Sequence, residues 1–410
     1  MSANATGMQG VVLSSGGADG AYAVGVLKAL LNGKSRVTGY LPLDAGVYVG
    51  NSIGGLNSAL LVSQLEDGPQ AAVSFLENVW LNEIAQGAQG CGNGTYRIRL
   101  NPATVFDPTC YADAPLRTFT NIASDTLFLA QDSLARTLDL ATSNDRWAQR
   151  GLRLVNLGSF ISPEPLRRLI DKTIRFDRIR VSNTALRVMA TNWTRGGLDT
   201  FSNADLTNEL GPRIIQASAA IPGFFPPVMV GEYVYVDAAV LGYATLAPAI
   251  NAGADTLHII YVDPDISAIP LETLQSTLDT LYRTFTIQWA NNLEVSVQAV
   301  DRINTQVGVL EQTIREGNLT KPLAEYLITK MLPSGRITLD PNKELLGLRV
   351  VTVHRYHPKD DLFGPLGLLN LDRRRLEALI TRGFNDTVAH DCMASGCVIA
   401  RSPVEVQDAD

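Results

Sequence analysis

The residues best suited to chemistry form the pattern Gly50-Asn51-Ser52-Ile53-Gly54. It follows a short apolar run at 46–49 and precedes a small, apolar stretch from about residue 55 to residue 64. A G-x-S-x-G turn between a strand and a helix is typical of a nucleophile elbow, because the glycines allow a strained turn that exposes the serine hydroxyl. The amino end of the following helix would stabilise negative charge beside that hydroxyl. We therefore predict that Ser52 is a nucleophile.

A second loop, Ser15-Gly16-Gly17-Ala18-Asp19-Gly20, also lies between an apolar run and a helix-like stretch. A serine nucleophile generates an oxyanion, and preorganised backbone N–H groups are the usual means of holding it. The loop lacks the G-K-[ST] ending of a phosphate-binding P-loop and fits a dinucleotide fingerprint only loosely. A purely structural turn is the other alternative. We interpret Gly16, Gly17 and Ala18 as the oxyanion loop.

A base must take the proton from the serine, and carboxylates and histidines are the candidates. Asp237 closes an expected strand at 233–236, where a side chain points into the crevice in which such folds place their sites. Burial would raise its pKa far enough for it to accept the proton. His258 lies in an apolar strand and is read as a core residue. His354 and His357 lie at a strand end and remain alternative bases, in a Ser–Asp–His triad.

Alternating apolar strands and helices must position these residues. Such a chain is predicted to fold as α/β, with a mostly parallel central sheet covered by helices on both faces. We expect strands at 10–14, 46–49, 186–191, 233–236, 256–262 and 348–354, and helices at 21–31, 55–64, 124–140, 165–170, 271–316 and 372–384.

Domain organisation follows from where these signals weaken. Residues 8–265 are expected to form the core, with an insertion at 77–159 that is either a lid or a structural lobe. Residues 266–410 are expected to form a mostly helical extension packed on the same domain. No repeat of 20–50 residues indicates a solenoid.

Composition and charge exclude several classes. The 410 residues carry 34 Lys plus Arg against 41 Asp plus Glu, for a net charge of −7, and 46 % are apolar. The chain therefore forms a core, and nucleic acid is not an expected partner. The sequence contains neither a signal-peptide pattern nor 18 consecutive apolar residues, so we expect a soluble cytoplasmic protein. The oligomeric state is left open.

The four cysteines, Cys91, Cys110, Cys392 and Cys397, form no CxxC pair. No histidine lies at a typical zinc-ligand spacing from any of them, so no metal or other cofactor is predicted. They are read as unlinked thiols of a reducing compartment. Disulfides Cys91–Cys110 or Cys392–Cys397 are the alternative for an oxidising one.

Taken together, these motifs resemble the patatin-like phospholipase family, whose pattern is a G-G-G-x-[RK]-G oxyanion loop, a G-x-S-x-G elbow and a D-G-[GA] aspartate. The elbow around Ser52 matches fully, and residues 217–227 are similar to the segment that precedes the family's aspartate. The resemblance runs from about residue 10 to residue 250. Here the loop has Ser15 for the first glycine and Asp19 for the basic residue, while Ala238 replaces the glycine after the aspartate.

The resemblance implies a three-layer fold and a serine lipid acyl hydrolase that needs no metal. A Ser52–Asp237 dyad would cleave carboxylic ester bonds of phospholipids or related acyl esters through an acyl-enzyme. The alternatives are the triad esterase and a degenerate, non-catalytic member that binds lipid or a partner, suggested by Asp19 and Ala238. Any contact with a membrane surface is expected to be local, transient or partner-assisted. We expect the rings of Phe224 and Phe225 to pack in the core; the alternative is that they flank the mouth of the site, where exposed aromatic rings would help to lift a lipid from a bilayer.

Overall fold

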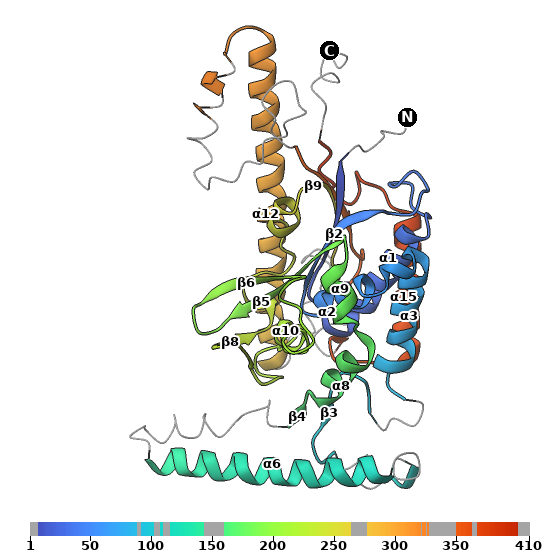
Figure 1. Cartoon of the computed structure of the whole chain (residues 1–410), viewed down its shortest axis with the longest axis vertical. Coiled ribbons are helices and arrows are strands. Elements are labelled where there is room, and N and C mark those ends of the chain that lie inside the picture. Colours follow the sequence, from blue (N-terminus) through green and yellow to red (C-terminus); the bar gives the residue numbers. More distant parts are fainter. Residues whose placement is uncertain are drawn as a thin grey trace.

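The structure is a computed structural model of the chain, organised around a central sheet (Figure 1). It describes residues 7–87, 92–101, 107–109, 115–142, 160–263, 277–320, 322–324, 326–327, 350–362 and 367–400. Cys91 and Cys110 lie outside these residues, as do residues 88–91, 102–106, 110–114 and 143–159 of the expected insertion at 77–159. Within the described residues, no helix is long and apolar enough to cross a membrane.

Eight strands form the sheet, in the order β10-β9-β1-β2-β5-β8-β7, with β6 paired to β5. The first five in this order are mutually parallel, and β6, β7 and β8 pair antiparallel. The predicted α/β class with a mostly parallel central sheet is thus confirmed. The strands are β1 (Met8–Leu13), β2 (Ala45–Asn51), β5 (Ala185–Asn192), β6 (Gly197–Ser202), β7 (Val228–Val230), β8 (Tyr233–Val236), β9 (Ala254–Ile260) and β10 (Thr352–Tyr356).

Helices cover both faces of the sheet, as Figure 1 shows. Side chains of alternate strand residues enter two separate cores: Leu13 and Tyr48 enter one, Val12 and Val49 the other. The first core packs under α1 (Gly20–Leu31), α2 (Ile53–Val62), α3 (Pro69–Val79) and α15 (Arg373–Val388). The second packs under α11 (Ala247–Asn251) and α12 (Thr277–Arg315). Strands buried on both faces explain why β1 and β2 read as continuous apolar runs.

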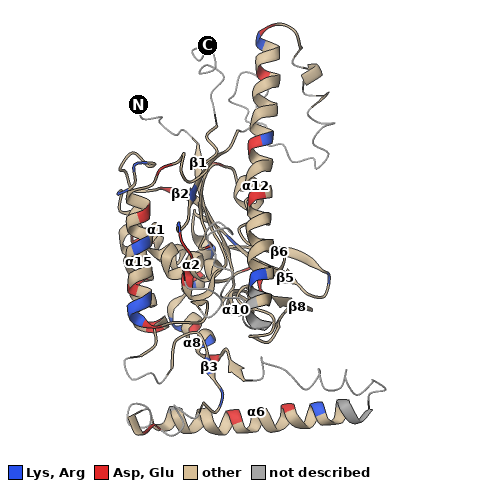
Figure 2. Ribbon diagram, turned by 180° about the vertical axis from the view of Figure 1, so that it is seen from behind, with Lys and Arg blue, Asp and Glu red and all other residues tan. Residues whose placement is uncertain are grey.

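The chain between β2 and β8 also contains smaller elements. They are the helices α8 (Glu164–Thr173), α9 (Phe176–Val181) and α10 (Gly211–Ser218), and the strand pair β3 (Arg97–Ile98) and β4 (Ile161–Ser162). One long helix, α6 (Pro115–Thr142), lies beyond β3, β4 and α8 in both overall views (Figures 1 and 2). Single turns occur at Gly17–Asp19, Leu65–Asp67, Trp80–Ile84 and Ala238–Val240.

Helices α1 and α15 come into backbone contact although they are far apart in the sequence. A Cβ atom added to Gly383 of α15 would lie 2.1 Å from the carbonyl oxygen of Tyr22 in α1. The Tyr22 hydroxyl in turn donates a hydrogen bond of 3.1 Å to Asp386 of α15. Because backbone atoms cannot yield as a side chain can, this crossing requires glycine.

We predict that Gly383→Ala lowers the free energy of unfolding by about 1–3 kcal/mol, the usual cost of overpacking. The matched control is Gly308→Ala in α12, where an added Cβ meets nothing within 4 Å. It should stabilise the protein by up to about 1 kcal/mol, because alanine favours a helix more than glycine does. Urea unfolding of both variants checks the prediction. Equal effects would contradict it.

Candidate active site

Ser52 occupies a sharp turn between β2 and α2. Its backbone has φ 55° and ψ −124°, a strained conformation for a residue with a side chain. The neighbouring glycines make the turn possible. A Cβ at Gly50 would lie 2.2 Å from the Gly54 carbonyl oxygen, and one at Gly54 would lie 2.4 Å from that of Leu13. The pattern G-x-S-x-G is therefore required by close backbone approach on both sides of the serine.

The hydroxyl of Ser52 donates a hydrogen bond of 2.5 Å to Oδ2 of Asp237. Asp237 directly follows β8, and its other carboxylate oxygen accepts a 2.7 Å bond from the Ala239 N–H. The Asp237 N–H donates to the Ala220 carbonyl at 2.9 Å. Ser52 and Asp237 are 3 % and 1 % exposed. The structure thus brings together the two residues predicted as nucleophile and base.

Burial raises the pKa of Asp237 to about 7, although the bonds from Ser52 and Ala239 favour the ionised form. A carboxyl with this pKa is partly ionised at neutral pH and can both take and return a proton. A carboxyl with these properties, hydrogen-bonded to the Ser52 hydroxyl, is suited to act as a general acid and base toward that hydroxyl.

Two further side chains hold the elbow in place. The Ser218 hydroxyl accepts a 3.0 Å bond from the Ser52 N–H. The Asn51 amide donates to the Gly242 carbonyl and, at 3.3 Å, to the Thr245 hydroxyl. These bonds tie the serine turn to α10 and to the chain that follows Asp237. Neither side chain could be singled out from the sequence, because Asn51 occupies a variable position of the G-x-S-x-G pattern and Ser218 is one residue of the segment at 217–227 that precedes the aspartate.

The predicted oxyanion loop lies beside the elbow, and a distant segment covers it. The Ala18 N–H donates a hydrogen bond of 2.8 Å to the carbonyl oxygen of Leu368. The Leu369 carbonyl accepts a 2.6 Å bond from the Tyr96 hydroxyl. The amide of Ala18 is thus already engaged by a carbonyl oxygen.

An apolar cavity reaches Ser52 and the loop residues Gly17 and Ala18. Phe225 lines it and lies edge-on to Tyr96, with ring centroids 6.5 Å apart. The expected packing of Phe225 in the core is therefore wrong, because this ring faces the cavity. Other lining side chains are Leu56, Trp80, Leu166, Leu369 and Leu371.

A family model described as Patatin-like phospholipase matches residues 11–250. The chain belongs to the patatin-like phospholipase family. A search of curated proteins finds no match. Among solved structures, the chain is similar to VipD from Legionella pneumophila, with 13 % identity and a TM-score of 0.34, over 93 % of this chain and 66 % of that one.

The patatin-like core departs from the family's loop pattern at Asp19, and the structure shows what accompanies the change. Asp19 is buried and forms an ion pair with Arg375 of α15. Burial raises the pKa of the Asp19 carboxyl, and the Arg375 guanidinium opposes the rise. Arg375 also donates to the carbonyls of Leu362 and Asn370, at 2.8 and 3.0 Å. A basic group is therefore present beside the loop, supplied by a helix instead of by the loop itself.

The other departure, Ala238, is accommodated without strain. It begins the single turn after Asp237, is fully buried and has no positive φ. A methyl group fits here because the turn uses ordinary backbone angles.

The histidines considered as alternative bases have other partners. His354 Nδ1 lies 3.2 Å from Cys392 Sγ, and His357 Nδ1 lies 3.1 Å from the Pro358 carbonyl oxygen. His258 is buried in β9 and lies 2.9 Å from Gln9, which confirms its reading as a core residue.

Because the carboxyl of Asp237 is buried, we predict how the free energy of unfolding depends on pH. The pKa of Asp237 is about 7 when folded against an ordinary 3.8, so the folded state holds its proton more tightly. The resulting stabilisation is complete below about pH 4 and is lost as pH rises to about 7, at up to about 1.4 kcal/mol per pH unit. Because asparagine does not titrate, the Asp237→Asn variant does not lose stability in this way as the pH rises. Its free energy of unfolding, relative to that of the wild type, should therefore be higher at pH 8 than at pH 5.

Urea unfolding at both pH values measures this difference, and other titrating groups cancel in the comparison. Asp171→Asn in α8, which removes an exposed carboxylate, is the control and should follow the wild type. Parallel curves for wild type and Asp237→Asn would show that Asp237 does not carry the raised pKa.

Proposed function

We propose that the protein is a serine lipid acyl hydrolase that uses a Ser52–Asp237 dyad. The observation that carries the proposal is the 2.5 Å hydrogen bond to a buried carboxylate from the hydroxyl of Ser52, which lines an apolar cavity. Membership of the patatin-like phospholipase family supports lipid acyl esters as the substrate class.

In the proposed reaction the Ser52 oxygen attacks the ester carbonyl while Asp237 takes the hydroxyl proton. The tetrahedral intermediate then expels the alcohol, which leaves with the proton from Asp237, and the acyl-enzyme remains. Water attacks the acyl group with Asp237 again as base, releasing the carboxylic acid and restoring the serine. The amino end of α2 favours negative charge at this point.

The oxyanion is assigned to the backbone N–H groups of Gly16, Gly17 and Ala18. Because the Ala18 amide already donates to the Leu368 carbonyl, that carbonyl must move aside before the amide binds substrate. The position of the Leu368 carbonyl oxygen is also the position at which a substrate oxygen would accept a hydrogen bond from the Ala18 amide.

We predict that a fluorophosphonate probe labels the wild type and not Ser52→Ala. Ester hydrolysis should fall by about 10³-fold or more in Ser52→Ala and by about 10²–10⁴-fold in Asp237→Asn, the usual worth of a positioned base. The wild-type kcat/KM should rise with pH through about 7, because the base acts in its ionised form. Ser74→Ala, an exposed serine of α3, is the control and should keep both labelling and turnover.

Each alternative has its own outcome in this experiment. A triad would make a histidine replacement, such as His357→Ala, as damaging as Ser52→Ala. A degenerate member would leave the wild type inert toward short-chain esters. Equal labelling of wild type and Ser52→Ala would remove the assignment of the nucleophile.

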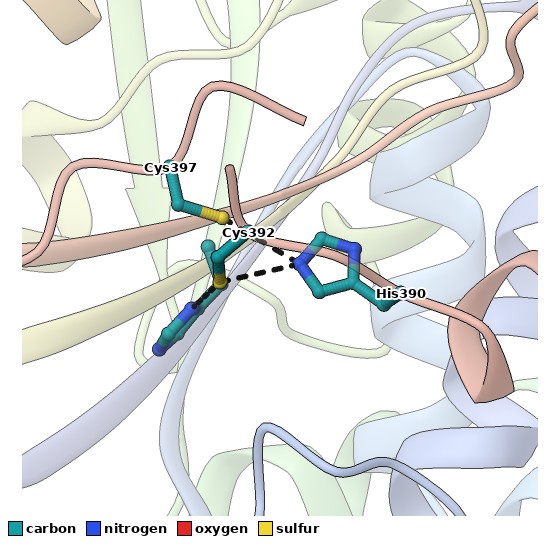
Figure 3. A group of neighbouring side chains, drawn as sticks. His390, Cys392 and Cys397 are labelled. Atoms are coloured by element: carbon teal, nitrogen blue, oxygen red, sulfur yellow. Dashed lines mark hydrogen bonds between the residues drawn. The ribbon is translucent and has the colours of Figure 1, made fainter. Parts of the chain in front are cut away.

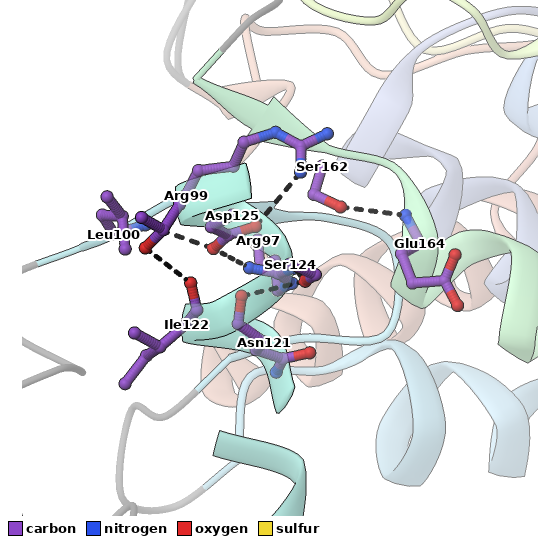
Figure 4. Close-up of polar contacts among 10 residues, drawn as sticks. Arg97, Arg99, Leu100, Asn121, Ile122, Ser124, Asp125, Ser162 and Glu164 are labelled. Carbon is purple, nitrogen blue, oxygen red and sulfur yellow. Dashed lines mark hydrogen bonds and ion pairs between the residues drawn. The ribbon is translucent and has the colours of Figure 1, made fainter. Parts of the chain in front are cut away.

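A lipid substrate requires access to a lipid surface, and α6 supports a place for it. Six large apolar side chains of α6 are exposed. Phe128 packs against Arg99, and the other five are Leu116, Phe119, Leu127, Leu134 and Leu138. With successive residues rotated by 100° about the helix axis, these five side chains fall within an arc of about 100° on one side of α6. The buried Asp125 lies on the opposite side of the helix, where it pairs with Arg97 and Arg99 beside β3 (Figure 4). The helix therefore presents its charged side to the protein and its apolar stripe outward.

Such an outward stripe suits the boundary between lipid headgroups and acyl chains. Since the net charge of −7 gives no general attraction to anionic lipid, we propose that α6 contacts the membrane by apolar insertion. Arg99 fixes the helix further, with its guanidinium 3.9 Å from the centre of the Phe128 ring.

We predict that Leu127→Asp combined with Leu134→Asp weakens binding to phosphatidylcholine vesicles at least tenfold, because burying one leucine is worth about 1.5–3 kcal/mol. Hydrolysis of a soluble short-chain ester should be unchanged. The matched control, Leu127→Met with Leu134→Met, keeps the stripe apolar and should bind like the wild type. Vesicle cosedimentation measures both. Undiminished binding of the aspartate variant would rule out this surface.

A further inference from the structure

Four metal-ligand side chains meet at the edge of the sheet distant from Ser52. His354 comes from β10, while His390, Cys392 and Cys397 come from the segment that follows α15. One ligand atom of each residue lies within 4.8 Å of every other (Figure 3). We call this group the His–Cys cluster. Neither cysteine is in a disulfide.

The separations match those of ligands around one tetrahedral ion. His354 Nδ1 lies 3.2 Å from Cys392 Sγ, and His390 Nε2 lies 3.5 Å from both Cys392 Sγ and Cys397 Sγ. Zinc bonds of about 2.3 Å to sulfur and about 2.0 Å to nitrogen, at the tetrahedral angle, place sulfur and nitrogen about 3.5 Å apart. The sulfur and nitrogen atoms are therefore already spaced as ligands.

The backbone holds this arrangement by itself. The Cys397 N–H donates to the Cys392 carbonyl at 3.0 Å, which closes the loop that carries both cysteines. The next residue, Val398, pairs with Val353 of β10 through two bonds of 2.7 and 2.9 Å. The loop is thus fixed against the strand that supplies His354.

Neighbouring groups orient the two imidazole rings. His390 Nδ1, the nitrogen turned away from the cluster, lies 3.5 Å from the Ser395 hydroxyl. The His390 ring also packs on Tyr356, with centroids 4.5 Å apart, and the His354 ring stacks on His258 at 5.3 Å. Partners on the outer nitrogen and face of a histidine are typical of metal sites, because they fix its orientation.

We propose that the His–Cys cluster binds one Zn²⁺ as a structural site. Two sulfur and two nitrogen ligands in tetrahedral spacing are the set that zinc prefers, and four protein ligands leave no position open for a substrate. Binding releases one proton from each thiol, so two thiolates neutralise the charge of the ion. The ion fastens the chain after α15 to β10. This proposal does not depend on the proposed hydrolase activity, because β9 and β1 separate β10 from the strand that leads to Ser52.

The test uses the full chain, purified without chelator and analysed for metal by mass spectrometry. We expect about one zinc per chain in the wild type. Cys392→Ser and Cys397→Ser should each lose most of it. Met393→Ser changes an exposed residue of the same loop that is not a ligand, and it should keep the metal. Zinc content that is equal in Cys397→Ser and wild type would overturn the proposal.

A second measurement covers the case in which the cysteine variants do not fold. Zinc is removed from the wild type with a chelator and replaced by Co²⁺, which should give the intense ultraviolet sulfur-to-cobalt absorption of a thiolate site. Removal should also lower the midpoint of thermal unfolding, and Zn²⁺ should restore it. A Cys392–Cys397 disulfide would instead give two fewer titratable thiols and no cobalt spectrum, which would also overturn the proposal.

Discussion

The hydrogen bond between Ser52 and Asp237 joins the two halves of the sheet. Ser52 directly follows β2 in the parallel part, and Asp237 directly follows β8 in the antiparallel part. Both side chains are buried, so the carboxylate is partly deprived of water, and its raised pKa follows from that burial. The elbow, the Ser218 contact and the Asn51 bonds all serve to keep these two residues within reach of each other. The same burial lowers the stability of the folded protein at neutral pH and raises the pKa of Asp237 far enough for it to act as a base there.

The predicted oxyanion loop depends on a part of the chain that lies outside the family match. The match covers residues 11–250, whereas Leu368 and Arg375 contact Ala18 and Asp19 from beyond it. The charge reversal at position 19 is thus understandable as half of a pair. The loop carries an acid, and α15 carries the matching base. Buried opposite charges of this kind are stable only together, because either one alone would be an uncompensated buried charge.

Much of this arrangement could be predicted from the sequence, because it depends on local patterns. Ser52 is marked by its glycines and Asp237 by the strand before it, and the structure places the two in contact. The pairing of Asp19 with Arg375 could not be predicted, since it joins residues 356 positions apart through the packing of two helices. The His–Cys cluster was missed for two reasons. His390, Cys392 and Cys397 are close in the sequence but form no CxxC pair, and His354 is 38 residues from Cys392 and is brought to them only by the position of β10. The expectation for Phe225 failed because an apolar ring fits a core and an apolar cavity equally well.

The crossing of α1 and α15 has a consequence for how the protein is made. Residues 19 and 375 emerge from the ribosome roughly 20–70 s apart, at a synthesis rate of about 5–20 residues per second. During that interval the first sheet strands exist without the helix that covers α1. A buried Asp19 has no counterion until Arg375 arrives, so this loop is among the last parts of the molecule to settle. The nascent chain therefore carries its serine long before it has a finished site around it.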